Sequence, residues 1–351
     1  MRYEIRAAVP EDEEQLLELA GHLNTVNLPN DRGHVRKLLD HSVRSFTAEI
    51  RDPRLRKYVF VLWDLEQGVA AGTSMLIGQL GRRDAPYIYF DVIAEEKYSP
   101  ALDKHFHHTA LRLGFSYGGP TEIGGLVVAP AYRKAVEKLG LLISYVRFLF
   151  ISAHRNWFRN EVLAELLPPL EPDGRSHLWD AVGRHFTGMS YAEADLLSSE
   201  NKDFIRDLFP RELIYASLLS PEAQGVIGKV GAQTRGVEKM LRRIGFRYAH
   251  RIDPFDGGPH FIAPVDEITL VRAARRALVL SGGPQAAGEP ALVARETAPP
   301  PFFRAVSTSV VLEAGGVRVD PEALAHLGSK PGDEVLCLPL RQAVTAREPR
   351  T

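Results

Sequence analysis

The sequence predicts an α+β fold, and three observations carry that prediction. Residues 121–153 have the pattern of a strand, a basic loop and a buried helix in succession. Three further runs rich in β-branched and aromatic residues, at 58–63, 69–77 and 87–93, predict strands that join residues 123–128 in an antiparallel meander. The chain contains neither a Gly-x-Gly-x-x-Gly pattern nor a P-loop, which argues against a dinucleotide-binding fold.

The composition is that of a globular protein without a bias toward nucleic acid or membrane partners. Of 351 residues, 45% are hydrophobic and 25% are charged, and the formal net charge is -1. The lone Cys337 excludes an internal disulfide framework. No apolar run is long enough to cross a bilayer, and the first residues lack the apolar core of a signal peptide. We therefore expect a cytoplasmic protein that binds neither nucleic acid nor membrane.

The first fifty residues predict a strand, a helix, a polar loop and a second helix. The strand covers about residues 3–9, and Pro10 with the acids that follow it suits the start of the first helix. Residues 24–30, NTVNLPN, are rich in turn formers and predict a loop. The second helix is expected over residues 31–49.

The basic loop at the centre of the strand-loop-helix unit predicts an anion-binding site. Pro130 ends the strand, because proline cannot donate to a β-ladder. The loop carries Arg133, Lys134 and Lys138, and the apolar helix starts at about Gly140. Free N–H groups at a helix start, the positive end of the helix dipole and these cations together suit a pyrophosphate. The alternative is an ordinary strand-loop-helix unit whose cations are solvated.

Three histidines, His105, His107 and His108, lie close together in the sequence. On a helix, His105 and His108 would share one face, which is one requirement of a metal site. No cysteine, and no acid at a second fixed spacing, completes such a site. We therefore expect no metal and interpret the histidines as polar surface residues.

A helix-rich insertion is predicted over about residues 156–232, beginning with a helix at 157–167. Within it, Asp180 and Arg184 either pair as i,i+4 neighbours on a helix, or Arg184 binds a carboxylate of a ligand. His185 is either a general base or an ordinary capping or core residue. The residues alone leave both alternatives open.

The last third of the chain predicts a helix, a tight turn and a β-rich tail. The helix spans residues 234–248 with Gly245 as its break, and residues 253–259, DPFDGGP, predict a hairpin turn. Residues 281–301 are rich in Gly, Ala and Pro and predict a linker. Residues 302–351 predict a small β-rich C-terminal module.

Four short segments form a specific set of motifs. They are YR at 132–133, RFLFI at 147–151, HLWDAVGRHF at 177–186 and FDGGP at 255–259. The set resembles the arginine N-succinyltransferase family, within the GNAT superfamily of acyl-CoA N-acyltransferases. The resemblance implies a GNAT-like acyltransferase domain over residues 1–280 that contains the helical insertion, followed by the linker and the small module.

The same resemblance implies an activity and a set of site residues. The activity is transfer of a succinyl group from succinyl-CoA, or of another acyl group from its CoA ester, to the amine of arginine or a related amino acid. Leu126 matches a family position that contacts succinyl-CoA. The cofactor-binding residues that we expect are Leu126, Val127, Val128, Arg133, Lys134, Lys138, Leu139 and Gly140. The expected substrate-binding residues are Asn24, Asp180 and Arg184, and the catalytic candidate is His185.

The chain departs from the family pattern where proton and acceptor chemistry is expected. Family members carry a histidine, taken as the proton donor, at the position of Gly231. Lys138 replaces a loop glycine, and lysine adopts left-handed backbone angles less readily than glycine. The alternative hypothesis is therefore a non-catalytic or regulatory partner subunit. In either case we expect a homodimer or a hetero-oligomer with a paralogous subunit.

Overall fold

The computed structural model describes residues 1–22, 28–83, 85–171, 174–284 and 288–341. Strands and helices are mixed along the chain, and fifteen strands of the described residues join in one sheet, so the predicted α+β class is confirmed. Four neighbouring strands form the centre of the sheet: β1 (Tyr3–Ala7), β2 (Lys57–Asp64), β3 (Val69–Ile77) and β6 (Thr121–Val128).

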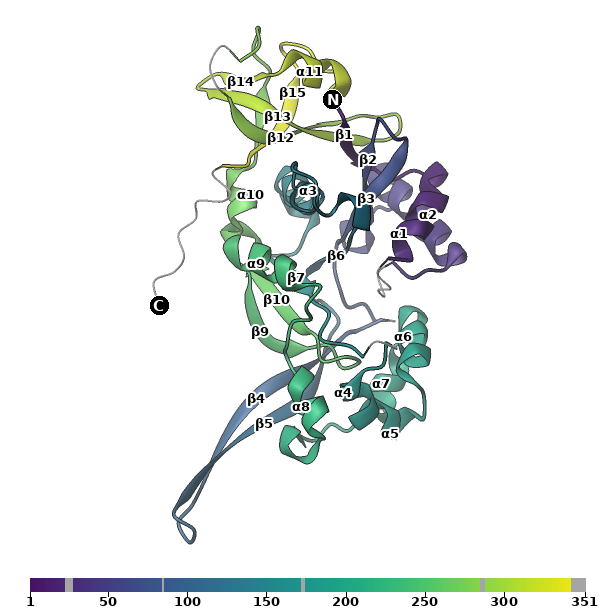
Figure 1. Ribbon diagram of the computed structural model, residues 1–351, viewed down its shortest axis with the longest axis vertical. Coiled ribbons are helices and arrows are strands. Elements are labelled where there is room, and N and C mark those ends of the chain that lie inside the picture. Colours follow the sequence, from purple (N-terminus) through teal and green to yellow (C-terminus); the bar gives the residue numbers. More distant parts are fainter. Residues whose placement is uncertain (23–27, 84, 172–173, 285–287, 342–351) are drawn as a thin grey trace.

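Helices cover both faces of these central strands. On one side lies α3 (Leu139–Ala153), and on the other lie α1 (Glu13–Ala20) and α2 (Arg32–Phe46) (Figure 1). In β2, Phe60 packs in the hydrophobic cluster of α3, while Val61 packs in that of α1 and α2. Because side chains alternate along a strand, a strand that is buried on both faces reads as a continuous apolar run.

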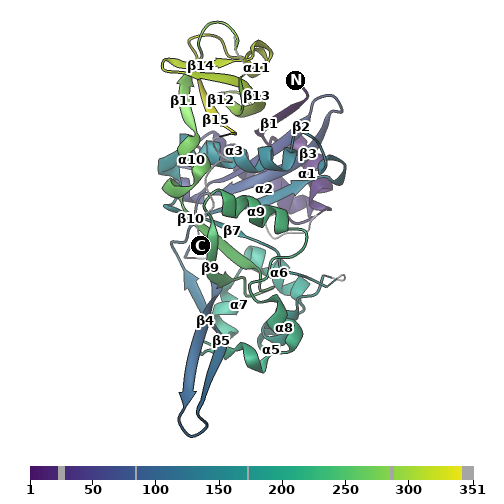
Figure 2. The ribbon, with the colours of Figure 1, turned by 60° about the vertical axis from the view of Figure 1, so that its left-hand side comes forward.

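A long two-stranded arm corrects two expectations. β4 (Tyr87–Ser99) and β5 (Lys104–Ser116) pair along their whole length and extend away from the body of the molecule (Figures 1 and 2). The histidines at 105–108 therefore lie on a strand, not on a helix. The predicted meander is also wrong, because β3 pairs directly with β6, while β4 pairs with β5 and with β9 (Arg247–Ile252). Local patterning identifies a strand without identifying its partner.

The predicted helix at 157–167 is wrong as well. Its centre is β7 (Glu161–Glu165), which pairs with β6 in parallel and with β10 (Pro259–Pro264) in antiparallel orientation. Val162, Leu163 and Ala164 are all buried, so the segment lacks the alternation that distinguishes a strand from a short helix. The helical region thus begins after this strand.

The helical region packs around the buried Trp179 and the strands at the base of the arm. Its helices are α4 (His177–Ala181), α5 (Gly183–Thr187), α6 (Tyr191–Glu200), α7 (Asp203–Leu208) and α8 (Pro221–Val226). Strand β8 (Ile214–Tyr215) pairs with β5. In the part of the chain that the structure describes, no helix is both long and apolar enough to span a bilayer.

After the helical region, the chain forms α9 (Arg235–Arg243), β9 (Arg247–Ile252), β10 and α10 (Thr269–Ala273). Gly245 ends the α9 segment with a φ of 111°, as the sequence predicts. β9 and β10 form the antiparallel pair expected around the Asp253–Pro259 turn.

The C-terminal part forms a β-rich layer around α11 (Pro321–Leu327). Its strands are β11 (Arg275–Leu278), β12 (Glu289–Glu296), β13 (Phe303–Glu313), β14 (Gly316–Val319) and β15 (Glu334–Pro339). The predicted linker at 281–301 is corrected here, because it contains β12, which pairs with both β13 and β15. β13 also pairs with β1, so this layer continues the main sheet. The proposed division into domains stays a prediction.

Candidate active site

A cleft opens beside the end of β6 and the start of α3. Its volume is about 520 Å³. The residues that line it are Leu126, Val127, Val128, Arg133, Ala135, Lys138, Gly140 and Leu141 on one side, and Gln233, Thr234, Gly236, Val237 and Met240 on the other. We call it the donor cleft. It is apolar along β6 and α9 and carries two cations at the loop.

The N-terminus of α3 faces the donor cleft, since Gly140 and Leu141 of its first turn line the wall. Lys138 precedes the helix with φ 55° and ψ 49°, the left-handed conformation that glycine adopts without strain. Arg133 curls back and donates from Nε to the carbonyl oxygen of Val128 at 2.9 Å. Unpaired N–H groups of a helix start and two nearby cations make this end of the cleft suitable for a phosphate.

A second, deeper space adjoins the donor cleft and shares Leu126, Thr234 and Val237 with it. We call it the inner cavity; its volume is about 140 Å³. It lies where β6 and β7 diverge: they pair at Thr121↔Val162 and Glu122↔Leu163, and farther along their residues line opposite walls. β6 bulges against β3 at this point, and Gly125 has a φ of 54°.

Arg147 brings a positive charge to the wall of the inner cavity. It projects from the middle of α3 and is 2% exposed. Its guanidinium donates to the carbonyl oxygens of Ser144 and Gly124 and to the hydroxyl of Ser144. Among the described residues, no carboxylate lies within 4.0 Å of it. Burial alone lowers the pKa of Arg147 to about 9, so the group remains a buried cation at neutral pH.

Four carboxylates line the other end of the inner cavity. They are Glu165 at the end of β7, Asp195 on α6, and Asp253 and Asp256 in the turn between β9 and β10. Burial, reinforced by the charges of neighbouring acids, raises the pKa of Glu165 and of Asp256 well above the ordinary range. The same causes raise the pKa of Asp195 to about 7.

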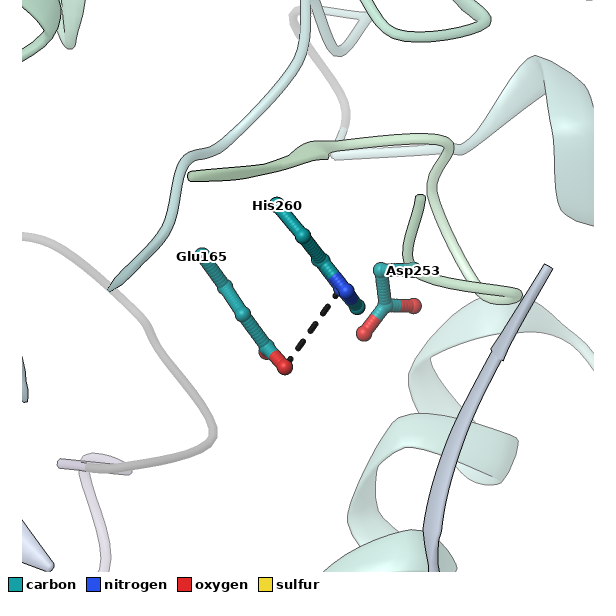
Figure 3. Close-up of side chains that lie close together, drawn as sticks. All are labelled: Glu165, Asp253 and His260. Carbon is teal, nitrogen blue, oxygen red and sulfur yellow. Dashed lines mark ion pairs between the residues drawn. The ribbon is translucent and has the colours of Figure 1, made fainter. Parts of the chain in front are cut away.

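Glu165 and Asp253 meet His260 of β10 (Figure 3). One ligand atom from each residue lies within 4.8 Å of the others, and the imidazole sits between the two carboxylates. His260 is fully buried, and burial lowers its pKa to about 3, so the ring is neutral. Nδ1 forms a 2.7 Å hydrogen bond with the hydroxyl of Tyr87. Nε2 lies 3.4 Å from Oε1 of Glu165 and has no hydrogen-bond partner among the described residues.

Two family models together match nearly the whole chain. A model of the family described as arginine N-succinyltransferase beta subunit matches residues 3–270. The chain belongs to the arginine N-succinyltransferase family. A model of that family's C-terminal domain matches residues 275–339.

Relatives support this membership over nearly the whole chain. An arginine N-succinyltransferase of Yersinia pestis is 32% identical over 98% of this chain and 99% of its own length. One from Salmonella paratyphi B is 32% identical over 88% of this chain and 93% of its length. The structure of arginine/ornithine succinyltransferase subunit AI from Pseudomonas aeruginosa is similar with a TM-score of 0.81 and 28% identity, covering 97% of this chain and 99% of that one. The α+β fold of this chain is therefore the fold of that subunit over nearly its whole length.

Most of the residues predicted from the family resemblance to bind the cofactor come together in the donor cleft. Leu126, Val127, Val128, Arg133, Lys138 and Gly140 all line it. Lys134 is exposed on the loop outside the cleft lining, and Leu139 packs in the main hydrophobic core with 1% exposure.

The predicted substrate-binding and catalytic residues lie elsewhere. Arg184 and His185 are exposed on α5, and neither lines the donor cleft or the inner cavity. The nearest oxygen of Asp180 to the Arg184 guanidinium is 3.6 Å away, which matches the i,i+4 pairing that the sequence allows. Asn24 lies outside the described residues. The roles assigned to these four residues stay predictions.

Sequence reasoning missed Arg147 and the cavity carboxylates as site residues. The sequence could have identified Arg147, because a single arginine in an otherwise apolar helix requires polar partners inside the protein. The sequence around Asp253 and Asp256 indicated only that they are acidic residues of a turn. Glu165 and Asp195 had no local signal, since their convergence depends on the packing of β7 against α6 and the β9–β10 turn.

Gly231, which stands where family members carry histidine, packs against the chain that follows β7. Its N–H donates to the carbonyl oxygen of Leu167 at 2.8 Å. A Cβ built on Gly231 would lie 2.5 Å from the carbonyl oxygen of Pro168, closer than real Cβ atoms come. The local backbone therefore has no room for a side chain at this position.

Proposed function

We propose that this protein transfers a succinyl group from succinyl-CoA to the amine of arginine or a related amino acid. The observation that carries the proposal is Arg147, a buried cation on the wall of a cavity continuous with the donor cleft. A succinyl group differs from an acetyl group by a terminal carboxylate. A guanidinium without a carboxylate partner is the group best suited to bind it.

The donor cleft supports a coenzyme A ester as the donor. The pyrophosphate fits the start of α3, where backbone N–H groups, Arg133 and Lys138 supply positive charge. The apolar walls along β6 and α9 suit the pantetheine arm. The thioester would then lie near Leu126, which lines both the donor cleft and the inner cavity.

The reaction is a nucleophilic displacement at the thioester carbonyl. The neutral amine attacks the carbonyl carbon, a C–N bond forms and the C–S bond breaks. The attacking amine must first lose the ammonium proton, and Asp195, whose pKa is raised to about 7, is a suitable acceptor near neutral pH. The departing thiolate is a good leaving group, so the absence of a side chain at Gly231 does not prevent the reaction.

The relatives support the acceptor class and an oligomer. Their names specify arginine, or arginine and ornithine, and the Pseudomonas protein is described as one subunit of its enzyme. We propose that this chain also assembles, with itself or with a paralogue. The alternative of a non-catalytic partner subunit gains no support from these relatives. The cytoplasmic location stays a prediction from composition.

Calorimetric titration of the purified protein with succinyl-CoA and with acetyl-CoA tests the donor. We expect succinyl-CoA to bind at least about tenfold more tightly, the effect of ~1.4 kcal/mol from one charge-assisted contact. Incubation with succinyl-CoA and arginine should then give N-succinylarginine by mass spectrometry. Equal binding of both esters, or binding without product from any cationic amino acid, contradicts the proposal.

A further inference from the structure

The acidic end of the inner cavity lacks a partner of opposite charge. Glu165, Asp195, Asp253 and Asp256 converge there, and among the described residues none of them forms an ion pair with a lysine or arginine within 4.0 Å. Lys202 influences several of them electrostatically but pairs with none at that distance. Carboxylates that converge without counterions repel one another and lose part of their hydration, so the site favours a cation from outside the chain.

His260 does not itself line the inner cavity, but it lies against Glu165 and Asp253, which do, and it is an independent sign of a ligand there. Its imidazole is fully buried between Glu165 and Asp253, and Nε2 has no hydrogen-bond partner in the described chain (Figure 3). Buried polar atoms in folded proteins are nearly always paired. The hydroxyl of Tyr87 holds Nδ1 and so fixes the plane of the ring. A group that reaches Nε2 also reaches both carboxylates, because the three ligand atoms lie within 4.8 Å of one another.

We propose that this acidic end binds the positively charged side chain of the acceptor amino acid, with Glu165, Asp253 and His260 as its specificity-determining contacts. This inference rests on the proposed acyl transfer to arginine or a related amino acid, and it assigns the residues that recognise the side chain of that acceptor. A guanidinium offers five N–H donors in a plane and suits several acceptors spread around it.

The position of the cluster fits an acceptor that must also reach the thioester. Glu165 and Asp253 line the same cavity as Gly124 and Leu126 of β6. An acceptor anchored there by its side chain therefore presents its α-amine within the space next to the donor. Arg147 lies on the wall of that cavity as well, so the cavity offers a cation for the succinyl carboxylate and anions for the acceptor.

A divalent metal is the other ligand that two carboxylates and a histidine nitrogen accept. The arrangement favours the organic cation for two reasons. Asp195 and Asp256 extend the acidic surface beyond the three clustered residues, and the cavity volume of about 140 Å³ exceeds what one ion occupies. A metal at this position is therefore an outcome that the experiment must detect.

The test compares arginine with citrulline, which has the same length but a neutral ureido group. We expect arginine to bind by calorimetry in the absence of acyl-CoA, with citrulline at least about 100-fold weaker. In the variants Asp253→Asn and Glu165→Gln, the preference for binding arginine over citrulline should fall below about tenfold. Glu161→Gln, which changes an exposed acid at the other end of β7, is the matched control and should keep the full preference. Thermal unfolding shows whether each variant is folded.

Three results would overturn the proposal. They are equal binding of arginine and citrulline, an unchanged preference in both folded variants, and a stoichiometric metal whose removal by EDTA abolishes arginine binding. The outcomes also separate this inference from the proposed function. If the protein transfers succinyl to arginine and to citrulline alike, the proposed function is supported and the proposed acceptor site is contradicted. If the protein binds arginine selectively but transfers no succinyl group, the acceptor site is supported and the proposed function is contradicted.

Discussion

The donor cleft and the inner cavity share three residues, yet they are built in different ways. One continuous stretch, residues 126–141, supplies a whole wall of the donor cleft. The inner cavity instead draws its side chains from β6, β7, α3, α6, α9 and the β9–β10 turn. The donor cleft carries cations at a loop, whereas the inner cavity is lined by four carboxylates and one buried arginine.

This difference shows which kinds of site are local. A helix start preceded by basic residues binds anions through its own backbone, so its chemistry is present wherever that stretch folds. A cavity of buried charges exists only when distant elements hold the charges together against their desolvation cost. Substitutions at Arg147, Gly231, Asp195 and Lys138 test that contrast.

Arg147, on the wall of the inner cavity, should give the largest effect. We expect Arg147→Met to lower kcat/KM for succinyl-CoA about 100-fold, because a carboxylate would be left in the cavity without its cation. In the same variant, kcat/KM for acetyl-CoA should change less than about fivefold, since an acetyl group has no carboxylate. The variant Arg147→Lys keeps the positive charge and should retain part of the preference for succinyl-CoA over acetyl-CoA. An equal loss with both esters would show that Arg147 is only structural.

Gly231 tests whether the backbone beside Leu167, a residue of the inner cavity, accepts a side chain. We expect Gly231→Ala to destabilise the fold by about 2–3 kcal/mol, because the new Cβ meets the carbonyl oxygen of Pro168. Gly236→Ala is the control, because a Cβ there meets nothing within 4 Å. It should leave stability unchanged or raise it slightly. Denaturant unfolding measures both, and a Gly231→Ala protein as stable as the wild type would contradict the steric argument.

Asp195 tests the cost of charge in the inner cavity. Burial raises its pKa from 3.8 to about 7, so the folded protein keeps it protonated where the unfolded chain is ionised. Its contribution to stability is therefore fully present below about pH 4 and is lost as the pH rises to about 7.

The substituted side chain in the variant Asp195→Asn cannot ionise, so the variant does not lose stability as the pH rises. Relative to the wild type, the variant should gain about 1–2 kcal/mol of stability between pH 4 and pH 8. Urea unfolding at several pH values measures the difference. A difference that does not change with pH would mean that Asp195 is not held in its neutral form.

Lys138 should give the smallest effect, in the donor cleft. Lys138→Gly removes the strain of a left-handed lysine and should stabilise the protein by about 1 kcal/mol. It also removes a cation, so coenzyme A should bind a few-fold more weakly at low salt. Lys138→Gln keeps the strain but lacks the charge, and it separates the two effects. A loss of stability in Lys138→Gly would contradict the assigned backbone strain.

Several parts of the fold and site followed from local patterns. The strand at 121–128, the basic loop, the buried helix and the break at Gly245 all lie where the sequence predicts. The errors have a common cause. β7 and β12 are short segments whose strand pairing comes from distant partners, and the histidines at 105–108 lie in an arm whose pairing extends it well past its apolar part. Local periodicity does not contain such pairings.

The sequence by itself determined the family, the α+β class and the basic loop before the buried helix, because apolar spacing, proline and the start of a helix act over a few residues. Only the tertiary structure decided where Glu165, Asp195 and Asp253 meet, why His260 lies between two of them, and that Arg147 reaches the cavity. Those residues lie between positions 147 and 260 of the chain. Their chemistry depends on burial and mutual distance, which exist only after β7, α6 and the β9–β10 turn have packed together.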